Sequence, residues 1–146
     1  KVITPAMHKN GSDRDIIIQT MMLIFTNQDN DYTSFKSKDM NAFVIERGDD
    51  IIEKFLILTE ALNKLNDAFD EEALKIPSTS LPMVLYSAYR IIKDKKSFAR
   101  LTEKIILFIN EYDYNDYYKQ FLQSGTSNQE NVRGRLNYWK NIIREL

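Results

Sequence analysis

The sequence has no cysteine, and this absence removes several kinds of chemistry at once. Without thiols the chain can form no disulfide, no thiolate zinc site and no cysteine nucleophile. The absence suits a reducing compartment, and we expect a cytoplasmic protein. Histidine is also scarce, because His8 is the only one and no second imidazole can complete a metal site with it. We therefore expect His8 to be a surface residue, and we expect no metal ion or other cofactor.

Motifs that carry catalysis are missing as well. The sequence contains neither a phosphate-binding G-x-x-x-x-G-K-[ST] loop nor a G-x-S-x-G nucleophile elbow. Asp29, Asp31 and Asp39 lack the spacing and the central glycine of a calcium-binding loop. Asp13 and Asp15 fall on different faces of a helix, so they do not form a paired acid–base site. Because no nucleophile or acid–base arrangement converges, the sequence predicts a non-catalytic domain, and any enzymatic activity would reside in regions outside it.

Long hydrophobic runs are absent, and none approaches the roughly 18 residues that a membrane span needs. We expect no membrane contact. The chain does not begin with methionine and shows no secretory signal, so we expect a fragment of a longer protein. Its 146 residues suit a single domain, and its 43% apolar and 28% charged residues are typical of a globular fold.

The net charge of −1 gives the whole molecule no field that would attract nucleic acid. The charge is unevenly spread, however. Residues 29–75 contain six basic and twelve acidic residues, whereas residues 76–146 contain eleven basic and seven acidic ones. We interpret this asymmetry as two solvated faces of opposite sign.

Apolar residues recur at helical spacing through most of the chain, which predicts an all-α fold. The longest stripe lies in residues 49–69 and consists of Ile51, Phe55, Leu58, Leu62, Leu65 and Phe69. Ile52, Leu56 and Ile57 broaden this stripe. We therefore expect this helix to be buried on more than one side, and the rest of the chain to be organised around it.

Six further helices follow from the same spacing and from capping residues. Residues 1–11 should be irregular because Pro5, Asn10 and Gly11 are breakers, and Asp70 to Ser80 is the longest irregular stretch. Ser12 with Asp15, and Ser127 with Glu130, resemble capping boxes. The expected helices run from Asp13 to about Thr26, from Ser34 or Ser37 to Gly48, from Ser80 to about Lys93, from Ser97 to Tyr112, from Asn115 or Asp116 to Gly125, and from Ser127 to the end. About seven helices with short loops predict a single-domain helical bundle over residues 1–146.

The last helix combines a core stripe with a basic face. Its stripe is centred on Trp139, and Gly134 is a sign of close helix packing. Arg133, Asn137, Lys140 and Arg144 are spaced by four, three and four residues, which places them on one face. A basic helix face can bind phosphates. The alternative is a solvated face whose charges complement the carboxyl end of the helix.

A run of tyrosines precedes this helix, and it too permits two interpretations. Exposed rings beside arginines could stack on nucleic-acid bases. An amphipathic rim would bury the rings and expose the hydroxyl groups. We favour the rim, because no basic residue is interleaved before Lys119. The residues concerned are Tyr112, Tyr114, Tyr117 and Tyr118.

Several segments together resemble the helical region of bacterial DUF262 proteins, which follows an N-terminal ParB/sulfiredoxin-like domain. The sequence Ser12-Asp13-Arg14-Asp15 resembles the D-R-E start of that region, and residues 32–44 (YTSFKSKDMNAFV) resemble its short y…f…m..f segment. Residues 55–69 with Ser80-Leu81-Pro82 resemble its long helix, loop and following helix. The ending from Gly125 to Trp139 resembles its closing G-T…V-x-x-R…W helix, which places Arg135 in the arginine position.

The resemblance implies the helical companion domain of a DNA-modification-dependent restriction or phage-defence protein. The family's D-G-Q-Q-R-type motif and the H-N-H motif of longer relatives are absent, so no catalytic residue is carried over. The implied partner is the N-terminal, nucleotide-dependent nuclease domain of the same parent protein, and DNA is a second implied partner. The candidate nucleic-acid contacts are Arg133, Arg135, Lys140 and Arg144.

The alternative is a stand-alone protein–protein interaction module of a bacterial or phage regulator. The two hypotheses differ in what they predict for the surface. A companion domain should expose an apolar patch of several hundred Å² where its neighbour was removed. An independent module should not, unless it dimerises. The sequence does not fix the oligomeric state.

Overall fold

The chain folds into an all-α bundle, as its periodicity predicts. The computed structural model describes residues 2–69 and 76–146, in which there are eight α-helices and no strand. Part of the predicted irregular stretch, residues 70–75, lies outside the described residues. No described helix combines the length and the hydrophobicity that a membrane crossing requires. The helices are α1 (Pro5–Asn10), α2 (Ser12–Phe25), α3 (Ser37–Arg47), α4 (Ile51–Ala68), α5 (Leu81–Lys93), α6 (Phe98–Glu111), α7 (Asp116–Lys119) and α8 (Gln129–Glu145), with 3-10 turns η1 (Gly48–Asp50), η2 (Tyr112–Tyr114) and η3 (Gln120–Leu122).

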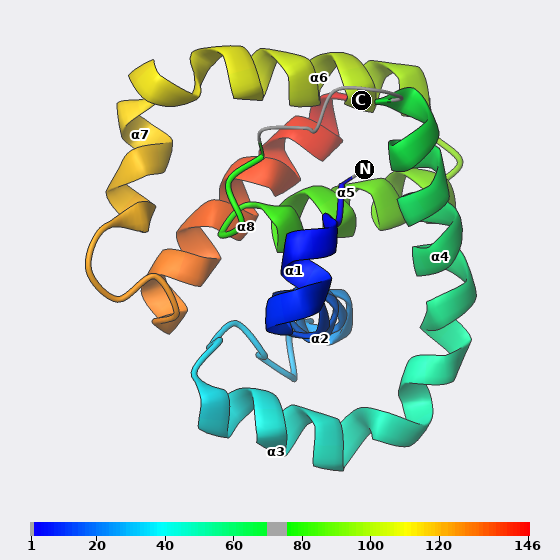
Figure 1. Ribbon diagram of the computed structural model, residues 1–146, viewed down its shortest axis with the longest axis vertical. Helices are drawn as coiled ribbons and strands as arrows, with labels where there is room; N and C mark the ends of the chain where they lie inside the picture. Colours follow the sequence, from blue (N-terminus) through cyan, green and yellow to red (C-terminus); the bar gives the residue numbers. More distant parts are fainter. Residues whose placement is uncertain (1, 70–75) are drawn as a thin grey trace.

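The helix at the centre of the bundle is α5. It packs against α2, α4, α6 and α8, and Figure 1 shows it inside a frame formed by α3, α4, α6 and α7. Every residue from Leu81 to Tyr89 is buried, so the first turns of α5 are surrounded on all sides. The buried hydroxyl of Ser87 donates to the carbonyl of Met83 at 2.8 Å, which satisfies it within the helix.

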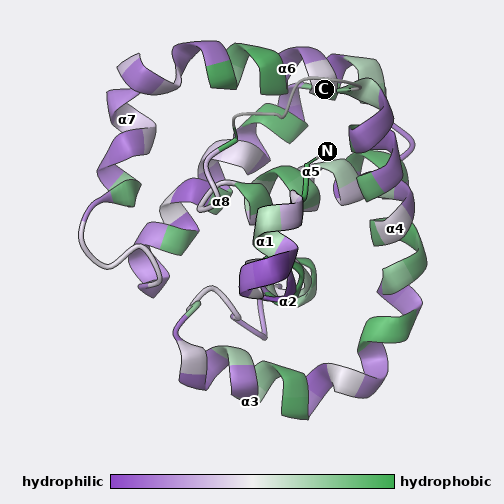
Figure 2. Cartoon of the chain, in the orientation of Figure 1, coloured by the Kyte–Doolittle hydropathy of each residue, from purple (hydrophilic) through white to green (hydrophobic). Residues whose placement is uncertain are grey.

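The helix α4 is not the central helix that its long apolar stripe predicted. Only Leu58, Ala61 and Leu65 are fully buried on α4. Ile52 and Leu56, which we expected to widen the buried face, are exposed instead. The reason is position, because α4 lies at the edge of the bundle with α5 on its inner side. Figure 2 shows hydrophobic positions along the half of α4 that is nearer α3.

The predicted irregular segment at the start of the chain contains the short helix α1. Pro5 and Gly11, which predicted an irregular segment, lie instead at the two ends of this helix. Pro5 lies in the first turn, where its missing N–H costs nothing. Thr4 caps the helix by accepting the N–H of Met7, and Gly11 ends it at a φ of 78°. Gly11 is also the N-cap of α2, so the capping box predicted from Ser12 does not form.

Two other predicted helix ends differ in the structure. Gly48 is right-handed, with a φ of −52°, so it does not stop α3 in the left-handed conformation, and the chain continues through η1 into α4. The helix α8 begins at Gln129 with Asn128 as its N-cap, so Ser127 and Glu130 form no capping box. The carbonyl of Ser127 instead accepts the N–H of Phe35 at 3.0 Å.

An aromatic cluster fixes α8 to α6 and α7. Trp139 is fully buried, as predicted, and its ring centroid lies 4.9 Å from that of Phe108 in an edge-to-face arrangement. Tyr118 is also buried and donates to Ser80 Oγ at 2.9 Å. Burial raises the pKa of Tyr118 to about 12. The tyrosine run is thus divided, because Tyr114 and Tyr117 are exposed while Tyr118 lies in the core.

The close packing predicted at Gly134 is present. The ring of Phe121, which belongs to η3, lies against the Cα of Gly134 and occupies the space that a Cβ would need. Glycine at this position therefore lets η3 approach α8 closely, and this contact fixes the loop that leads into α8.

Candidate functional site

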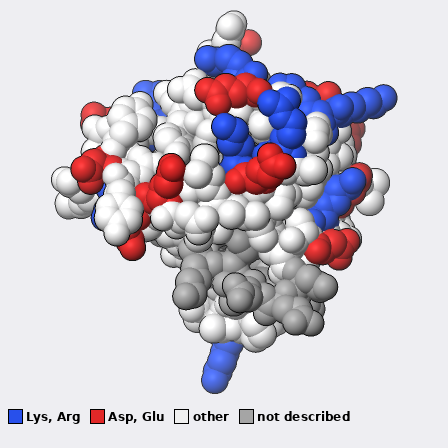
Figure 3. Space-filling model, turned by 90° about the horizontal axis from the view of Figure 1, so that it is seen from above, with Lys and Arg blue, Asp and Glu red and all other residues white. Residues whose placement is uncertain are grey.

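The face of the molecule over α6 carries charges of both signs, as Figure 3 shows for its described part. Lys104 lies 3.7 Å from a carboxylate oxygen of Glu145. Arg100 donates to the backbone carbonyls of Glu145 and Leu146 at 3.3 and 3.2 Å. Lys104 and Arg100 thus hold the end of α8. Because acidic and basic side chains are mixed on this face, its described part presents no patch of a single sign.

Arg135 is a structural residue rather than a surface contact. It is buried, and its guanidinium donates to the carbonyls of Phe121 and Thr126 at 2.7 and 2.8 Å. Burial lowers the pKa of Arg135. The side chain ties the segment before α8 to the helix itself. Because no phosphate can reach it there, Arg135 is removed from the candidate nucleic-acid contacts.

Arg133 is exposed, but an acid of the same domain meets its charge. It forms an ion pair with Asp31, with an Nε–Oδ2 distance of 3.0 Å. Partial burial acts to raise the pKa of Asp31, but hydrogen bonds from Thr33 and Arg133 hold that pKa below its ordinary value. The expected basic strip of Arg133, Lys140 and Arg144 is therefore interrupted at its first member.

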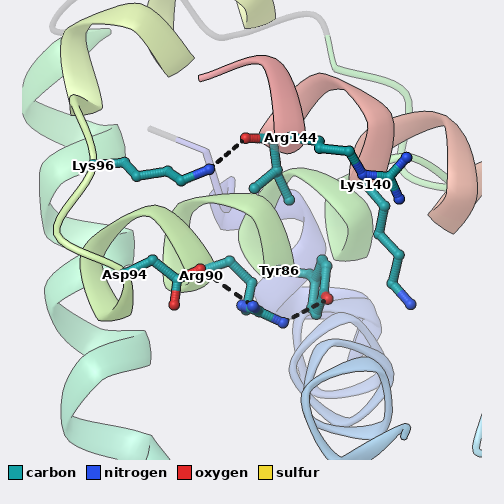
Figure 4. Close-up of a pocket in the computed structure, with 7 residues that line it drawn as sticks. Tyr86, Arg90, Asp94, Lys96, Lys140 and Arg144 are labelled. Carbon is teal, nitrogen blue, oxygen red and sulfur yellow. Dashed lines mark hydrogen bonds and ion pairs between the residues drawn. The ribbon is translucent and has the colours of Figure 1, made fainter. Parts of the chain in front are cut away.

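The other two cations of α8 line a cleft that the sequence did not predict (Figure 4). Lys140 and Arg144 lie on one side of this basic cleft, and Arg90 of α5 lies on the other. Lys96, from the turn after α5, completes a set of four cations. The cleft has a volume of about 270 Å³ and is lined by Tyr86, Arg90, Asp94, Lys96, Lys140, Ile143 and Arg144.

Two cations of the basic cleft are held in place. Arg90 donates to the Tyr86 hydroxyl at 3.3 Å and to Asp94 Oδ2 at 3.1 Å, which fixes its guanidinium along α5. Its Nε is buried and has no hydrogen-bond partner among the described residues. Lys96 donates to the carbonyl of Ile143 at 2.9 Å. These bonds orient positive charge along the floor and one end of the cleft.

Lys140 is the least compensated cation of the cleft. Within the described part of the chain it has neither an ion pair nor a hydrogen bond from its amine. Burial lowers the pKa of Lys140 most, and the positive charge of Arg90 lowers it further; Asp31 raises the pKa, and Arg144 lowers it by a smaller amount. The described residues that line the cleft therefore carry more positive than negative charge.

A second surface feature is an apolar ridge, defined by Ile45, Ile52, Phe55 and Leu56. These side chains are 85%, 75%, 52% and 78% exposed. Phe55 and Leu56 follow Ile52 by three and four residues, so these three side chains share the outer face of α4. Ile45 belongs to the last turn of α3, and Figure 1 shows α3 and α4 meeting at a corner of the fold. The helical spacing of Ile52, Phe55 and Leu56 predicted that they belong to the core, and their exposure shows that this prediction was wrong.

Among the described residues, no group of three or more histidine or acidic side chains is placed to hold a metal ion. The basic cleft and the apolar ridge are the two surfaces of the described chain that we consider as candidate sites. In comparisons with known proteins, no family model, no curated protein and no solved structure matched this chain.

Proposed function

We propose that this chain is a non-catalytic helical interaction domain that docks on another protein surface through the apolar ridge. The observation that carries the proposal is the exposure of four large apolar side chains at one corner of the fold. The largest apolar patch on a monomer typically covers roughly 300–600 Å² and is often functional. A companion domain separated from its neighbour is expected to have such a patch.

Burial of the ridge would supply a substantial driving force. Fully burying one such side chain is worth roughly 1.5–3 kcal/mol. The helix α4 gains little of this from Ile52 or Leu56 in the isolated domain, because the two side chains are largely exposed. A sequence that keeps three apolar residues on the outer face of one helix turn is therefore best explained by a partner that covers them.

The charges around the ridge indicate the chemistry of that partner. Residues 45–60 contain five acidic and two basic residues, a net charge of −3. One of the two basic residues, Arg47, is engaged by Tyr32 and Asp50. The partner surface should therefore be apolar at its centre and basic at its edge. A second copy of this chain would bring one acidic rim against another, which disfavours a symmetric dimer through the ridge.

The partner we propose is the N-terminal domain of the same parent protein, in accordance with the resemblance to the DUF262 helical region. The second candidate is a separate protein bound by a stand-alone module. The exposed ridge supports the first candidate, since it is the surface that removal of a neighbouring domain would leave.

A binding experiment with matched variants tests the proposal. The upstream region of the parent gene is produced separately, and its affinity for this chain is measured by calorimetry at two salt concentrations. Ile52→Gln with Leu56→Gln should weaken binding by about 100-fold, as expected for hot-spot residues. Ile106→Gln with Leu107→Gln, on the outer face of α6, is the control and should leave affinity nearly unchanged.

Two outcomes would contradict this function. Equal losses in the two double variants would show that the ridge is not the docking surface. A dimer of the isolated chain that only the α4 variant disrupts would identify a second copy as the occupant. Sedimentation of each variant distinguishes these results. Because all four positions are partly or largely exposed, each variant should remain folded, which circular dichroism checks.

A further inference from the structure

We propose that the basic cleft between α5 and α8 binds a small ligand through a phosphate group. The site is separate from the apolar ridge, and no part of the argument depends on the proposed docking function. The positive charges come from α5, from the turn that follows it and from α8, which is distant in the sequence and which the fold brings to the same cleft. Figure 4 shows Tyr86 and Arg90 on α5, Lys140 and Arg144 on α8, and Asp94 with Lys96 toward the other end of the cleft.

The balance of charge is the first argument. Four cations line the cleft and only one carboxylate, Asp94, lines it with them. That carboxylate is occupied by Arg90. The remaining positive charge has no counter-ion among the described residues that line the cleft. An oxyanion with several oxygens would accept charge-assisted hydrogen bonds from these donors.

The ends of the helices account for only part of this cluster. Lys96 caps the carbonyl of Ile143 and therefore serves the carboxyl end of α8. Arg144 lies in the last turn, where a cation complements the helix dipole. Lys140, however, lies more than one turn before the end of α8 and is half-buried beside other cations. Burial among like charges disfavours the charged form of this lysine, and a bound anion would offset that cost.

The donors are arranged before any ligand arrives. Tyr86 and Asp94 hold Arg90 from both sides, so its guanidinium loses little freedom on binding. The unpartnered Nε of Arg90 adds to the positive potential at the floor. Lys140 and Arg144, on the opposite side, are the side chains that can adjust to the ligand. This combination of a fixed guanidinium and adaptable cations suits a tetrahedral phosphate.

The dimensions favour a small phosphate ester over nucleic acid. The cleft volume of about 270 Å³ lies just below the roughly 300–1,000 Å³ of sites for drug-sized ligands. Duplex DNA would instead need a continuous strip of cations along the surface. Arg133 is paired with Asp31 and Arg135 is buried, so α8 provides no such strip.

Titration of the 146-residue chain tests the proposal. Orthophosphate and a phosphate monoester such as glycerol phosphate are each added at constant ionic strength, with sodium chloride as the balancing salt. Binding is followed through the amide resonances of ¹⁵N-labelled protein. We expect one saturable site in the millimolar range or tighter, with shifts confined to residues 86–96 and 140–144.

Charge-matched variants locate the site. Lys140→Gln and Arg144→Gln should each weaken phosphate binding by about tenfold, the loss of one charge-assisted hydrogen bond. Lys93→Gln removes the same charge from an exposed position on α5 outside the cleft, and it should change affinity less than twofold. All three positions lie outside the fully buried core, so each variant should fold.

The remaining outcomes are equally decisive. An ester that binds more tightly than orthophosphate would show that the cleft contacts the organic part, whereas equal affinities would place recognition in the phosphate alone. The proposal is overturned if no titration saturates in the millimolar range, or if Lys93→Gln weakens binding as much as Lys140→Gln. A short DNA duplex could instead bind more tightly than the ester, with an affinity that falls with salt as expected for several phosphate contacts. That result would favour nucleic-acid binding over the proposed phosphate-ester site. Substitutions in the apolar ridge should leave all these affinities unchanged.

Discussion

Arg133 and Arg135 lie two residues apart on α8, yet their environments differ completely. The guanidinium of Arg135 is enclosed and bonded to two backbone carbonyls, whereas that of Arg133 forms an ion pair at the surface. A buried carbonyl that loses its hydrogen-bond donor has no water to replace it, so the full cost of its desolvation remains. A surface charge that loses its ion-pair partner is hydrated instead, so the loss is small. The two residues should therefore contribute very differently to stability.

Substitution to methionine, which keeps most of the side-chain volume, should separate these contributions. Arg135→Met should lower the free energy of unfolding by about 2–4 kcal/mol, because the carbonyls of Phe121 and Thr126 both lose a donor. Arg133→Met should lower it by less than about 1 kcal/mol. Urea denaturation of both variants measures the difference. Similar losses would mean that Arg135 does not hold the segment before α8.

The sequence contains a signal for the role of Arg135, although the basic pattern hides it. Arg135 comes three residues after Val132 and four before Trp139, which places it beside the core stripe of α8. Arg133, Lys140 and Arg144 do not share that position. Spacing along one helix cannot reveal Arg90 and Lys96, however, because their nearness to α8 depends on the packing of α5 against α8.

Among the elements, α8 depends most on one side chain for its docking. Trp139 is fully buried and contacts the rings of Phe108 and Tyr138 edge-on. Trp139→Ala should lower the free energy of unfolding by about 3–5 kcal/mol, as large core truncations do. Tyr114→Ala, at a position that is 86% exposed, is the control and should cost less than about 0.5 kcal/mol. A loss below about 1 kcal/mol for Trp139→Ala would mean that α8 is not docked through its indole.

The positions of α4 and α5 show what periodicity can and cannot predict. Periodicity located both helices, with ends within a few residues of those observed. It ranked them wrongly, because a long stripe measures the length of an apolar face and not the number of neighbours that cover it. The better signal was in residues 81–89, which are almost without charged or large polar side chains and so suit a helix surrounded on all sides.

At the scale of the whole molecule, the uneven charge of the sequence corresponds to two different surfaces. The acidic rim of the apolar ridge belongs to the net-negative first half, and the basic cleft belongs to the net-positive second half. Neither candidate site could be predicted from the sequence alone. The ridge consists mainly of residues that look like core, and the cleft joins residues about fifty positions apart. Both become visible only when the packing of α3, α4, α5 and α8 is known.

Burial of tyrosines gives the whole molecule a characteristic response to alkali. Burial raises the pKa of five tyrosines, which are Tyr86, Tyr89, Tyr112, Tyr118 and Tyr138. The folded state therefore keeps protons that the unfolded state begins to release near pH 10. Stability from this source is complete below pH 10 and falls as the pH rises towards the folded pKa values. Lys140, whose pKa is lowered, contributes a smaller slope in the opposite direction.

Tyr118 provides the sharpest test of this response. Its pKa rises from 10.0 to about 12, which corresponds to about 3 kcal/mol of stability lost between these pH values. Tyr118→Phe should be less stable than the wild type by about 1 kcal/mol at pH 8, because Ser80 loses a buried partner. Its stability should then fall less steeply above pH 10, so that the two curves converge. Urea denaturation from pH 8 to 11 measures both slopes, and Tyr114→Phe, at an exposed position, should follow the wild type. Parallel curves for Tyr118→Phe and the wild type would show that the buried phenol is not the group whose ionisation opens the core.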